Sequence, residues 1–356
     1  MLVRCYSLEL PKSMKSIESQ ATDVISPRIC VIFPGALGDF ICFMPALETL
    51  RHVAFVDLFA RSEFAELVPD GIRISSLESP CISRLFRSAP DEDDDDRRFF
   101  DAYDEVYSWH GSGNREFVQR LKSLAGCRAH IFRFRPVHAL MHQADYYFGC
   151  LGHCSAGPEQ PAILFRPGAV RWCENFWIEH ALHGRAILTI APGSGAREKN
   201  WPKEFFLEVI QWWCKATGGR VLLLSGPVEQ ERGGIEQLTS ACTVASGLSL
   251  SQAAALLAHS DLYLGNDSGI SHLAAASGVR TVALFGPSDA HQWSPRGKKV
   301  TVLRRGVGCS PCGEPTMKSC PHRVCLTEFH PQQIIYELAQ LPEVVTLTRL
   351  RAGITV

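Results

Sequence analysis

The sequence has no long hydrophobic run and no excess of positive charge. Its longest apolar runs, such as residues 221–224, are far shorter than the ~20 residues that cross a bilayer. Lys and Arg number 36 against 37 Asp and Glu, which leaves no surplus to neutralise a nucleic-acid backbone. Residues 1–20 lack the apolar core of a secretory signal. We therefore expect a soluble, cytoplasmic protein that does not bind nucleic acid.

Cysteine is abundant, and most of it is scattered. Of the 14 cysteines, ten stand singly in apolar or mixed segments, which is typical of reduced, buried thiols in a cytoplasmic protein. The other four begin with a C-x-x-C pair, a spacing that can hold zinc or iron through four thiolates, with free thiols or a redox-labile disulfide as alternatives. Any metal here is expected to be structural, because no open coordination position is evident. These cysteines are Cys309, Cys312, Cys320 and Cys325.

The length and the apolar patterning predict two α/β domains. A chain of 356 residues that is 46% hydrophobic suits about two domains of roughly 150 residues each. An apolar run followed by a glycine turn and a helical pattern occurs in full twice, from residue 29 and from residue 186. Such runs are typical of strands buried on both faces of a parallel sheet. We predict two Rossmann-like halves that face each other across a cleft.

Proline and glycine between residues 158 and 168 separate the two halves, and we place the boundary near Gly184. The predicted organisation is an amino-terminal extension at 1–27, a first Rossmann-like domain at 28–183, a second Rossmann-like domain with the cysteine cluster at 184–330, and a carboxyl-terminal helix and tail at 331–356.

The second half alternates strands and helices more regularly than the first. The acidic run at residues 91–96 is interpreted as a solvated loop and is given no role. Beyond the two runs that precede glycine turns, strands are expected at 53–59, 105–109, 129–134, 221–224, 262–264 and 281–285, and helices at 41–50, 115–124, 137–151, 170–182, 250–259 and 268–276.

The two glycine turns define the expected active site. In such sheets ligands bind at the carboxyl ends of the strands, so the cleft between the halves is the expected site. Neither turn has the full G-x-G-x-x-G dinucleotide pattern or the G-x-x-x-x-G-K-[ST] phosphate loop. Nicotinamide chemistry and simple NTP hydrolysis are therefore disfavoured.

Asp267, Ser268 and Gly269 follow a predicted strand and start a helix. The N–H groups and the positive dipole end of such a helix suit a diphosphate. The structural alternative is that Asp267 or Ser268 is simply an N-cap. His272 lies one turn further on, where it can equally be a core histidine.

Two ionisable residues lie next to the glycine turns. Lys199 follows Gly193 and Gly195 and precedes a helix opened by Pro202, so it can neutralise a departing phosphate; the alternative is an exposed, solubilising lysine. Asp39 stands where the first turn meets its helix and can accept a proton as a general base. The helix dipole is expected to lower the pKa of Asp39, and an N-cap is the alternative role.

Three segments together resemble glycosyltransferase family 9, the ADP-heptose heptosyltransferases of lipopolysaccharide inner-core assembly and their relatives. They are PGALGD at 34–39, residues 195–202, and above all GNDSGISHLAAA at 265–276. LFGPSD at 284–289 also fits. The resemblance spans roughly residues 29 to 338.

The resemblance implies a GT-B fold, an inverting single displacement and no cofactor or metal for the chemistry. Asp39 is similar to the family's catalytic base, and Lys199 to the residue that holds the donor phosphates. The other residues that the resemblance assigns to an ADP-heptose-like sugar nucleotide are Ser194 and Gly195 in the phosphate-facing turn, Glu229 at the ribose, Leu248 at the adenine, and Asp267, Ser268, Gly269 and His272 at the diphosphate and sugar.

The acceptor and the exact reaction stay open. The first half lacks an obvious basic cluster for a phosphorylated lipid core; Arg128, Arg133 and Arg135 are the best candidates. The acceptor is lipopolysaccharide, another glycan or a protein, since relatives that modify autotransporter proteins carry an iron-binding cysteine motif. The alternatives are a sugar-nucleotide epimerase or hydrolase, and a metal-binding module on an idle scaffold. The family analogy also suggests peripheral association with the cytoplasmic face of the inner membrane.

Overall fold

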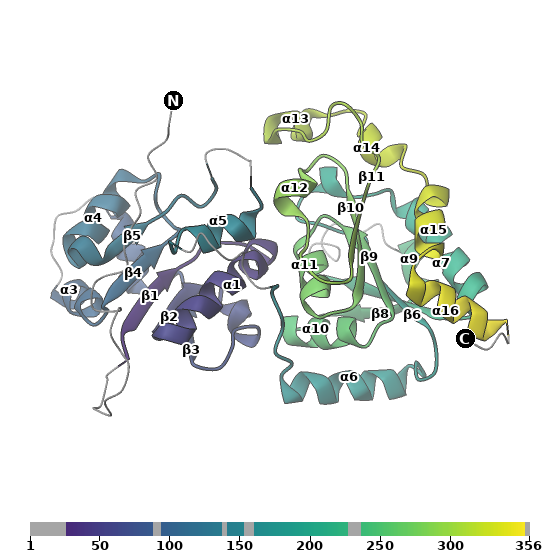
Figure 1. Ribbon diagram of the computed structural model, residues 1–356, viewed down its shortest axis with the longest axis horizontal. Coiled ribbons are helices and arrows are strands. Elements are labelled where there is room, and N and C mark those ends of the chain that lie inside the picture. The colour runs from purple at the N-terminus through teal and green to yellow at the C-terminus, as the bar shows by residue number, and fades with distance from the viewer. Residues whose placement is uncertain (1–25, 88–93, 137–140, 153–159, 227–235, 353–356) are drawn as a thin grey trace.

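The computed structural model describes residues 26–87, 94–136, 141–152, 160–226 and 236–352. Two parallel β-sheets, each with helices packed against it, lie side by side (Figure 1). The predicted α/β architecture of two Rossmann-like domains is confirmed.

The first sheet has the strand order β3-β2-β1-β4-β5, with every described pairing parallel. Its central strand is fully buried after the first residue, because RICVI carries apolar side chains to both faces. The strand order reverses between β1 and β4, which places a ligand-binding crevice at the carboxyl end of β1. The strands are β1 (Arg28–Ile32), β2 (Phe55–Ala60), β3 (Ile72–Ser76), β4 (Glu105–Ser108) and β5 (Ala129–Ile131).

The second sheet has the order β11-β10-β9-β6-β7-β8, again parallel. Counted from its own first strand this is 3-2-1-4-5-6, the dinucleotide-binding order, and it reverses between β6 and β9. The strands are β6 (Ile187–Ala191), β7 (Arg220–Ser225), β8 (Thr243–Ser246), β9 (Leu262–Asn266), β10 (Arg280–Phe285) and β11 (Val300–Arg304).

Helices connect and cover the strands of both sheets. Those that follow the first sheet's strands are α1 (Leu37–Val53), α2 (Pro80–Ser83), α3 (Asp94–Asp101), α4 (Arg115–Ala125) and α5 (Gln143–Gly149). Those of the second part are α6 (Pro167–Glu179), α7 (Lys203–Thr217), α9 (Glu236–Thr239), α10 (Leu250–Ala258), α11 (Gly269–Ala276), α12 (Ala290–Trp293), α13 (Glu314–Ser319), α14 (Val324–Thr327), α15 (Pro331–Ala339) and α16 (Pro342–Arg351).

The structure corrects the interpretation of the acidic run. Residues 94–101 form α3, and the carboxylate of Asp96 is fully buried, where it pairs with Arg84 and Arg120. A buried carboxylate needs such partners, so this end of the run is a structural ion pair and not a solvated loop. Part of the run, residues 91–93, lies outside the described residues.

The two domains touch directly through α1 and α11. Glycines allow the close approach, since a Cβ on Gly269 would lie only 2.9 Å from Cβ of Leu37 and 3.0 Å from the backbone N of Gly38. A second contact is polar: Arg296 donates two hydrogen bonds, of 2.7 and 2.5 Å, to Asp145. The first turn of α11 is thereby held against the first turn of α1.

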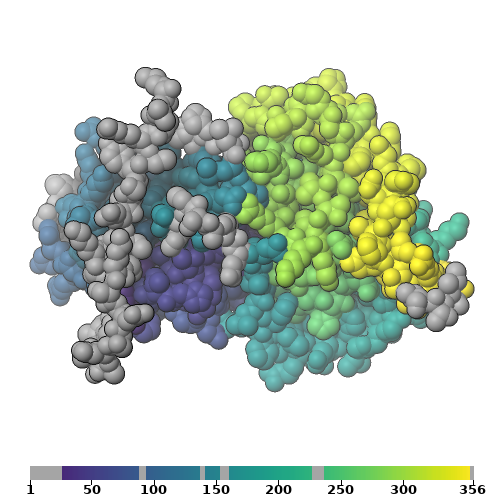
Figure 2. Space-filling model, viewed as in Figure 1, coloured from purple at the N-terminus to yellow at the C-terminus, as the bar shows by residue number. Residues whose placement is uncertain are grey.

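The carboxyl-terminal helices α15 and α16 pack on α7. They lie on the far side of the second domain from the first domain (yellow in Figure 2). Helix α6, which precedes the predicted boundary at Gly184, packs against α10 of the second domain. Among the described helices, none combines the length and the apolar character needed to cross a bilayer.

Candidate active site

A cavity of about 770 Å³ lies between the two domains. The first domain contributes Asp39 from α1 and Arg135 from the segment after β5. The second domain contributes the start of α11 and part of the loop that follows β6. The cavity therefore forms where each sheet reverses its strand order. Of the predicted site residues, Asp39, Gly195, Lys199, Asp267, Ser268, Gly269 and His272 line it.

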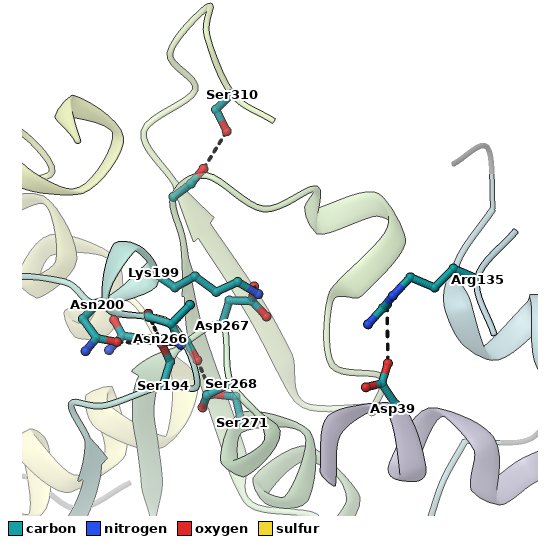
Figure 3. A network of polar contacts seen from close by, with 12 residues as sticks. Asp39, Arg135, Ser194, Lys199, Asn200, Asn266, Asp267, Ser268, Ser271 and Ser310 are labelled. Carbon is teal, nitrogen blue, oxygen red and sulfur yellow. Dashed lines mark hydrogen bonds and ion pairs between the residues drawn. The ribbon is translucent and has the colours of Figure 1, made fainter. Parts of the chain in front are cut away.

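Lys199 and Asp267 form an ion pair on the second domain's wall (Figure 3). The ammonium nitrogen lies 2.8 Å from Oδ2 of Asp267, whose side chain is 7% exposed against 28% for Lys199. Lys199 is therefore not a solubilising surface lysine. It is a cation held at the cavity wall, beside the start of α11.

The loop that carries Lys199 is held by Asn266 at the end of β9. Trp201 N donates to Oδ1 of Asn266 at 2.9 Å, and Nδ2 of Asn266 donates to the carbonyl of Pro192 at 2.7 Å. One buried amide thus fixes both ends of the loop. Ser194 lies within it, and its hydroxyl is 2.6 Å from both Ala196 O and Oδ1 of Asn200, so this side chain supports the loop's shape.

Helix α11 begins at the cavity with Ser268 in the N-cap position. No side chain caps it: Ser268 makes no capping hydrogen bond, and the Asp267 carboxylate is engaged with Lys199. Ser268 is therefore the N-cap residue, as the structural alternative predicted, but its side chain does not cap the helix. A helix start of this kind attracts an anion through its N–H groups and dipole.

Asp39 faces these groups from the first domain (Figure 3). Its Oδ2 accepts a hydrogen bond from Ala36 N at 3.3 Å, while its buried Oδ1 has no hydrogen-bond partner among the described residues. Nη1 of Arg135 lies 3.5 Å from Oδ1. Asp39 is thus a carboxylate with one oxygen available to a ligand in the cavity.

Burial raises the pKa of Asp39 above its ordinary value, and the nearby Arg135 only partly offsets this. The expectation that the helix dipole would lower the pKa is wrong in sign. The cause is the burial of the carboxyl at the start of α1, which removes it from water. Nearby, the ring of Phe33 stacks on that of Phe43 in α1, with 4.2 Å between the ring centroids. Gly35 permits this packing, since a Cβ there would lie 2.4 Å from the Phe33 ring and 2.7 Å from Cβ of Asp39.

His272 lies at the contact between the domains. Its Nδ1 is 3.6 Å from Sγ of Cys42 on α1, and its ring also hydrogen-bonds the backbone of Trp293. Burial lowers the pKa of His272 to about 4, so the ring is neutral. His272 also lines the cavity, and its predicted contact with a donor sugar stays a prediction.

Two predicted donor residues, Ser194 and Leu248, are not among the described residues that line the cavity. Leu248 packs against the hydrophobic core. Glu229 lies outside the described residues, so its predicted ribose contact stays a prediction. Among the candidate acceptor arginines, Arg135 lines the cavity, whereas Arg128 donates to the carbonyls of Phe100 and Tyr103 and has a structural role.

Comparison with known proteins identifies the family of the second half. Residues 158–321 match the family model described as Glycosyltransferase family 9 (heptosyltransferase). These residues are similar to a glycosyltransferase family 9 domain. The predicted resemblance is therefore confirmed.

Curated relatives of the family 9 domain include two heptosyltransferases. Lipooligosaccharide heptosyltransferase 2 of Campylobacter jejuni (serotype O:6) is 26% identical over 170 residues, which cover 45% of this chain and 52% of that protein. Lipopolysaccharide heptosyltransferase 1 of Pseudomonas aeruginosa is 27% identical over 169 residues, 44% of this chain and 48% of that protein. The chain thus spans about half the length of these relatives.

Solved structures share the fold over nearly the whole chain. A family 9 glycosyltransferase from Veillonella parvula has a TM-score of 0.71 at 22% identity and covers 92% of this chain and 99% of its own. The E. coli ADP-heptose lipopolysaccharide heptosyltransferase II has a TM-score of 0.65 at 18% identity, covering 91% and 99%. These likenesses establish the GT-B fold for both domains.

A third solved structure also shares the fold. The iron-containing dodecameric glycosyltransferase TibC of enterotoxigenic E. coli has a TM-score of 0.61 at 17% identity, covering 90% of this chain and 78% of its own.

The four clustered cysteines of this chain lie near one another. Burial raises the pKa values of Cys312 and Cys325, and the neighbouring thiols raise them further.

The predicted metal at these cysteines is nevertheless not supported. Within the described residues, which include all four, no three His, Cys, Asp or Glu side chains are placed to hold an ion. Cys312 Sγ points to the carbonyl of Cys309 at 3.1 Å, and Cys320 Sγ accepts from the backbone N of Arg323 at 3.4 Å. The thiols are close but directed at their own backbone, so the arrangement does not fit a four-thiolate site.

Sequence reasoning missed part of the cavity wall. Trp293 from α12 lines it although no motif marked this residue, and the same holds for Pro311, Gly313, Glu314 and Met317 of the cysteine segment. Cys312 also lines the cavity; the C-x-x-C motif marked it as a metal ligand and not as part of this wall. The only sequence signal was their position shortly after the carboxyl ends of β10 and β11, where α/β sheets bind ligands.

Proposed function

We propose that the protein is an inverting glycosyltransferase that transfers a heptose or a related sugar from an ADP-sugar to a hydroxyl of a glycan acceptor, the lipopolysaccharide inner core being the first acceptor to test. One observation carries the proposal: a cation and an uncapped helix start on one wall of a cavity face a half-satisfied, buried carboxylate on the other. Such an arrangement separates a leaving-group site from a base.

On the second domain, the diphosphate of the donor occupies the space before α11. There it takes Lys199 as counter-ion and the first N–H groups of the helix as hydrogen-bond donors. Asp267, released from Lys199, is then available to accept a hydrogen bond from a hydroxyl of the sugar. Gly195 allows backbone approach at the phosphates, and the assignments of Glu229, Leu248 and His272 to the donor rest on the family resemblance.

On the first domain, Asp39 takes the proton from the attacking acceptor hydroxyl. A raised pKa makes Asp39 a better proton acceptor at neutral pH than an ordinary aspartate. The hydroxyl attacks the anomeric carbon opposite the departing diphosphate, so the configuration inverts. Lys199 and the α11 dipole stabilise the charge that develops on the diphosphate, and no metal or cofactor takes part in this step.

The test is product analysis of the purified protein with ADP-heptose, UDP-sugars and GDP-sugars, with and without acceptor. Mass spectrometry should detect ADP release and a glycosylated acceptor only when both substrates are present. ADP release or an epimerised sugar without acceptor would favour the hydrolase or epimerase alternative. Heptose found on a protein acceptor and not on a glycan would favour the protein heptosyltransferase alternative.

The organisation follows from the same proposal. Residues 28–183 are the acceptor domain and 184–330 the sugar-nucleotide domain, with 1–27 as an extension. The predicted carboxyl-terminal helix and tail at 331–356 contains two helices, α15 and α16. By analogy with the family, the protein works in the cytoplasm, with peripheral association at the inner membrane.

A further inference from the structure

The cysteine segment after β11 contacts the loop that carries Lys199. Nη1 of Arg323, which lies between Cys320 and Cys325, is 3.0 Å from the carbonyl of Arg197 and 3.4 Å from that of Asn200. These carbonyls flank Lys199 in the 3-10 turn η5 (Arg197–Lys199). The carbonyl of Arg197 also accepts from the backbone N of Asn200 at 3.1 Å, so the guanidinium is a second donor to it and joins the carbonyls on either side of Lys199.

The backbone of Arg323 is fixed at the start of α14. Its φ of +46° is in the left-handed region, which costs free energy for a side chain other than glycine or asparagine. Its carbonyl accepts from the backbone N of Leu326 and of Thr327, at 2.8 and 2.9 Å. Such a conformation persists where the surrounding structure demands it, and here it directs the side chain toward the Lys199 loop.

Helix α14 is itself docked firmly on the second domain. Leu326 is fully buried, and a Cβ on Gly286 would lie 2.4 Å from its Cγ. Nearby, Cys312 N donates to the carbonyl of Pro287 at 2.7 Å. Helix α14, at whose start Arg323 lies, is therefore part of the packed core of the second domain.

We propose that Arg323 is a positioning residue for Lys199, which holds the turn at 197–200 so that the ammonium group meets the donor diphosphate. Asn266 fixes both ends of the loop, and Arg323 fixes its middle from the opposite side. This inference rests on the proposed function, because it gives Lys199 its diphosphate. It also gives the cysteine segment a role that needs no metal.

The test is the affinity of the full chain for ADP, measured by titration calorimetry. Arg323→Asn suits the left-handed backbone but cannot reach the loop, and it should weaken ADP binding about tenfold, the effect of losing roughly one charge-assisted hydrogen bond. Arg323→Lys, which keeps the charge, should recover most of that loss. The matched control is Arg305→Gln, which breaks an ion pair with Glu328 on the same segment and should leave the affinity unchanged.

A double-mutant cycle separates positioning from a general structural role. If Arg323 acts through Lys199, then Arg323→Asn should change ADP affinity less than about twofold in a Lys199→Gln background. Amide exchange of residues 197–201 in the unliganded protein should be faster in Arg323→Asn than in wild type, and unchanged in Arg305→Gln. Equal ADP affinity of wild type and Arg323→Asn, or equal effects in both backgrounds, would overturn the inference.

The failure of the inference is distinguishable from that of the proposed function. If the wild type does not bind ADP, the proposed function fails and the diphosphate role of Lys199 fails with it. If the wild type binds ADP and transfers sugar but Arg323→Asn behaves as wild type, only the inference about Arg323 fails. Should Arg323→Asn not fold, the cycle is run with Arg323→Gly, which also suits the left-handed backbone and cannot reach the loop. An effect of Arg323→Gly that persists in the Lys199→Gln background overturns the inference.

Discussion

The guanidinium of Arg135 stacks on the ring of Trp293 across the interdomain cleft, 4.3 Å from the ring centroid. The two residues come from different domains, and the same guanidinium is 3.5 Å from Asp39. Burial raises the pKa of Asp39, and the positive charge of Arg135 is the largest influence that lowers it. The stack on Trp293 therefore holds that charge in place. Closure of the domains and ionisation of the base are linked through one side chain.

We expect Trp293→Leu to shift the acid limb of the pH–rate profile upward. Without the ring, Arg135 is no longer held beside Asp39, so the pKa of Asp39 rises further and the rate begins to fall at a higher pH. Arg135→Gln should shift the limb in the same direction and by more. The measurement is kcat/KM against pH, with Trp172→Leu on α6 as control. An acid limb that stays in place or moves to lower pH in both variants contradicts the coupling.

Asp39→Asn should reduce the rate of sugar transfer by about 10²- to 10⁴-fold, the usual contribution of a general base. Binding of ADP should change little, because Asp39 lies on the wall opposite Lys199. Single-turnover rates and calorimetric affinities measure the two effects separately. Asp70→Asn, which removes an exposed partner of Arg166 outside the cavity, is the control and should retain full activity. Full transfer by folded Asp39→Asn would exclude Asp39 as the base.

The same Asp39→Asn substitution should stabilise the fold at neutral pH. The pKa of Asp39 is raised in the folded state, so its proton stabilises the fold below the unfolded value of 3.8, and that contribution is lost as the pH rises through the folded pKa. At pH 7 the buried carboxylate is therefore a net cost, and the neutral amide removes it. We expect a Tm higher by about 2 °C. A lower Tm at pH 7 than that of the wild type would show that the carboxylate is well satisfied.

The sequence predicts some of the strands and some of the site, but not all of them. The strands before the two glycine turns were predictable, because each is a continuous apolar run. The edge strands β3, β8 and β11 were not, since IRISS, TVAS and VTVLR are half exposed and lack such a run. Asp39 could be found from its position beside a glycine turn. Its raised pKa could not, because it depends on how deeply the fold buries the carboxyl, which the motif does not show.

His272 should make the fold sensitive to acid between about pH 6.5 and 4. Its pKa falls from 6.5 to about 4 on folding, so the unfolded chain binds a proton in this range and the folded chain does not. Stability present above pH 6.5 is lost as the pH falls toward 4, by about 2 kcal/mol at pH 5. Urea unfolding of wild type and His272→Gln at pH 7 and pH 5 isolates this contribution from that of His142, whose pKa is also lowered. The same loss in both proteins would assign the effect to other groups.

The Lys199–Asp267 pair allows catalysis and stability to be separated. Lys199→Gln alone should weaken ADP binding about tenfold and slow transfer further, because the diphosphate loses its cation as charge develops. It should also destabilise the domain by about 3 kcal/mol, since it leaves the nearly buried Asp267 carboxylate without its partner.

In the double variant Lys199→Gln/Asp267→Asn, no uncompensated charge remains at this position, so stability should return to within about 1 kcal/mol of the wild type while transfer stays low. Lys215→Gln, on the exposed side of α7, serves as the control for removal of a positive charge. Recovery of transfer together with stability would mean that Lys199 only supports the fold. If the double variant is stable but transfer stays low, Lys199 acts on the donor diphosphate and does not only support the fold.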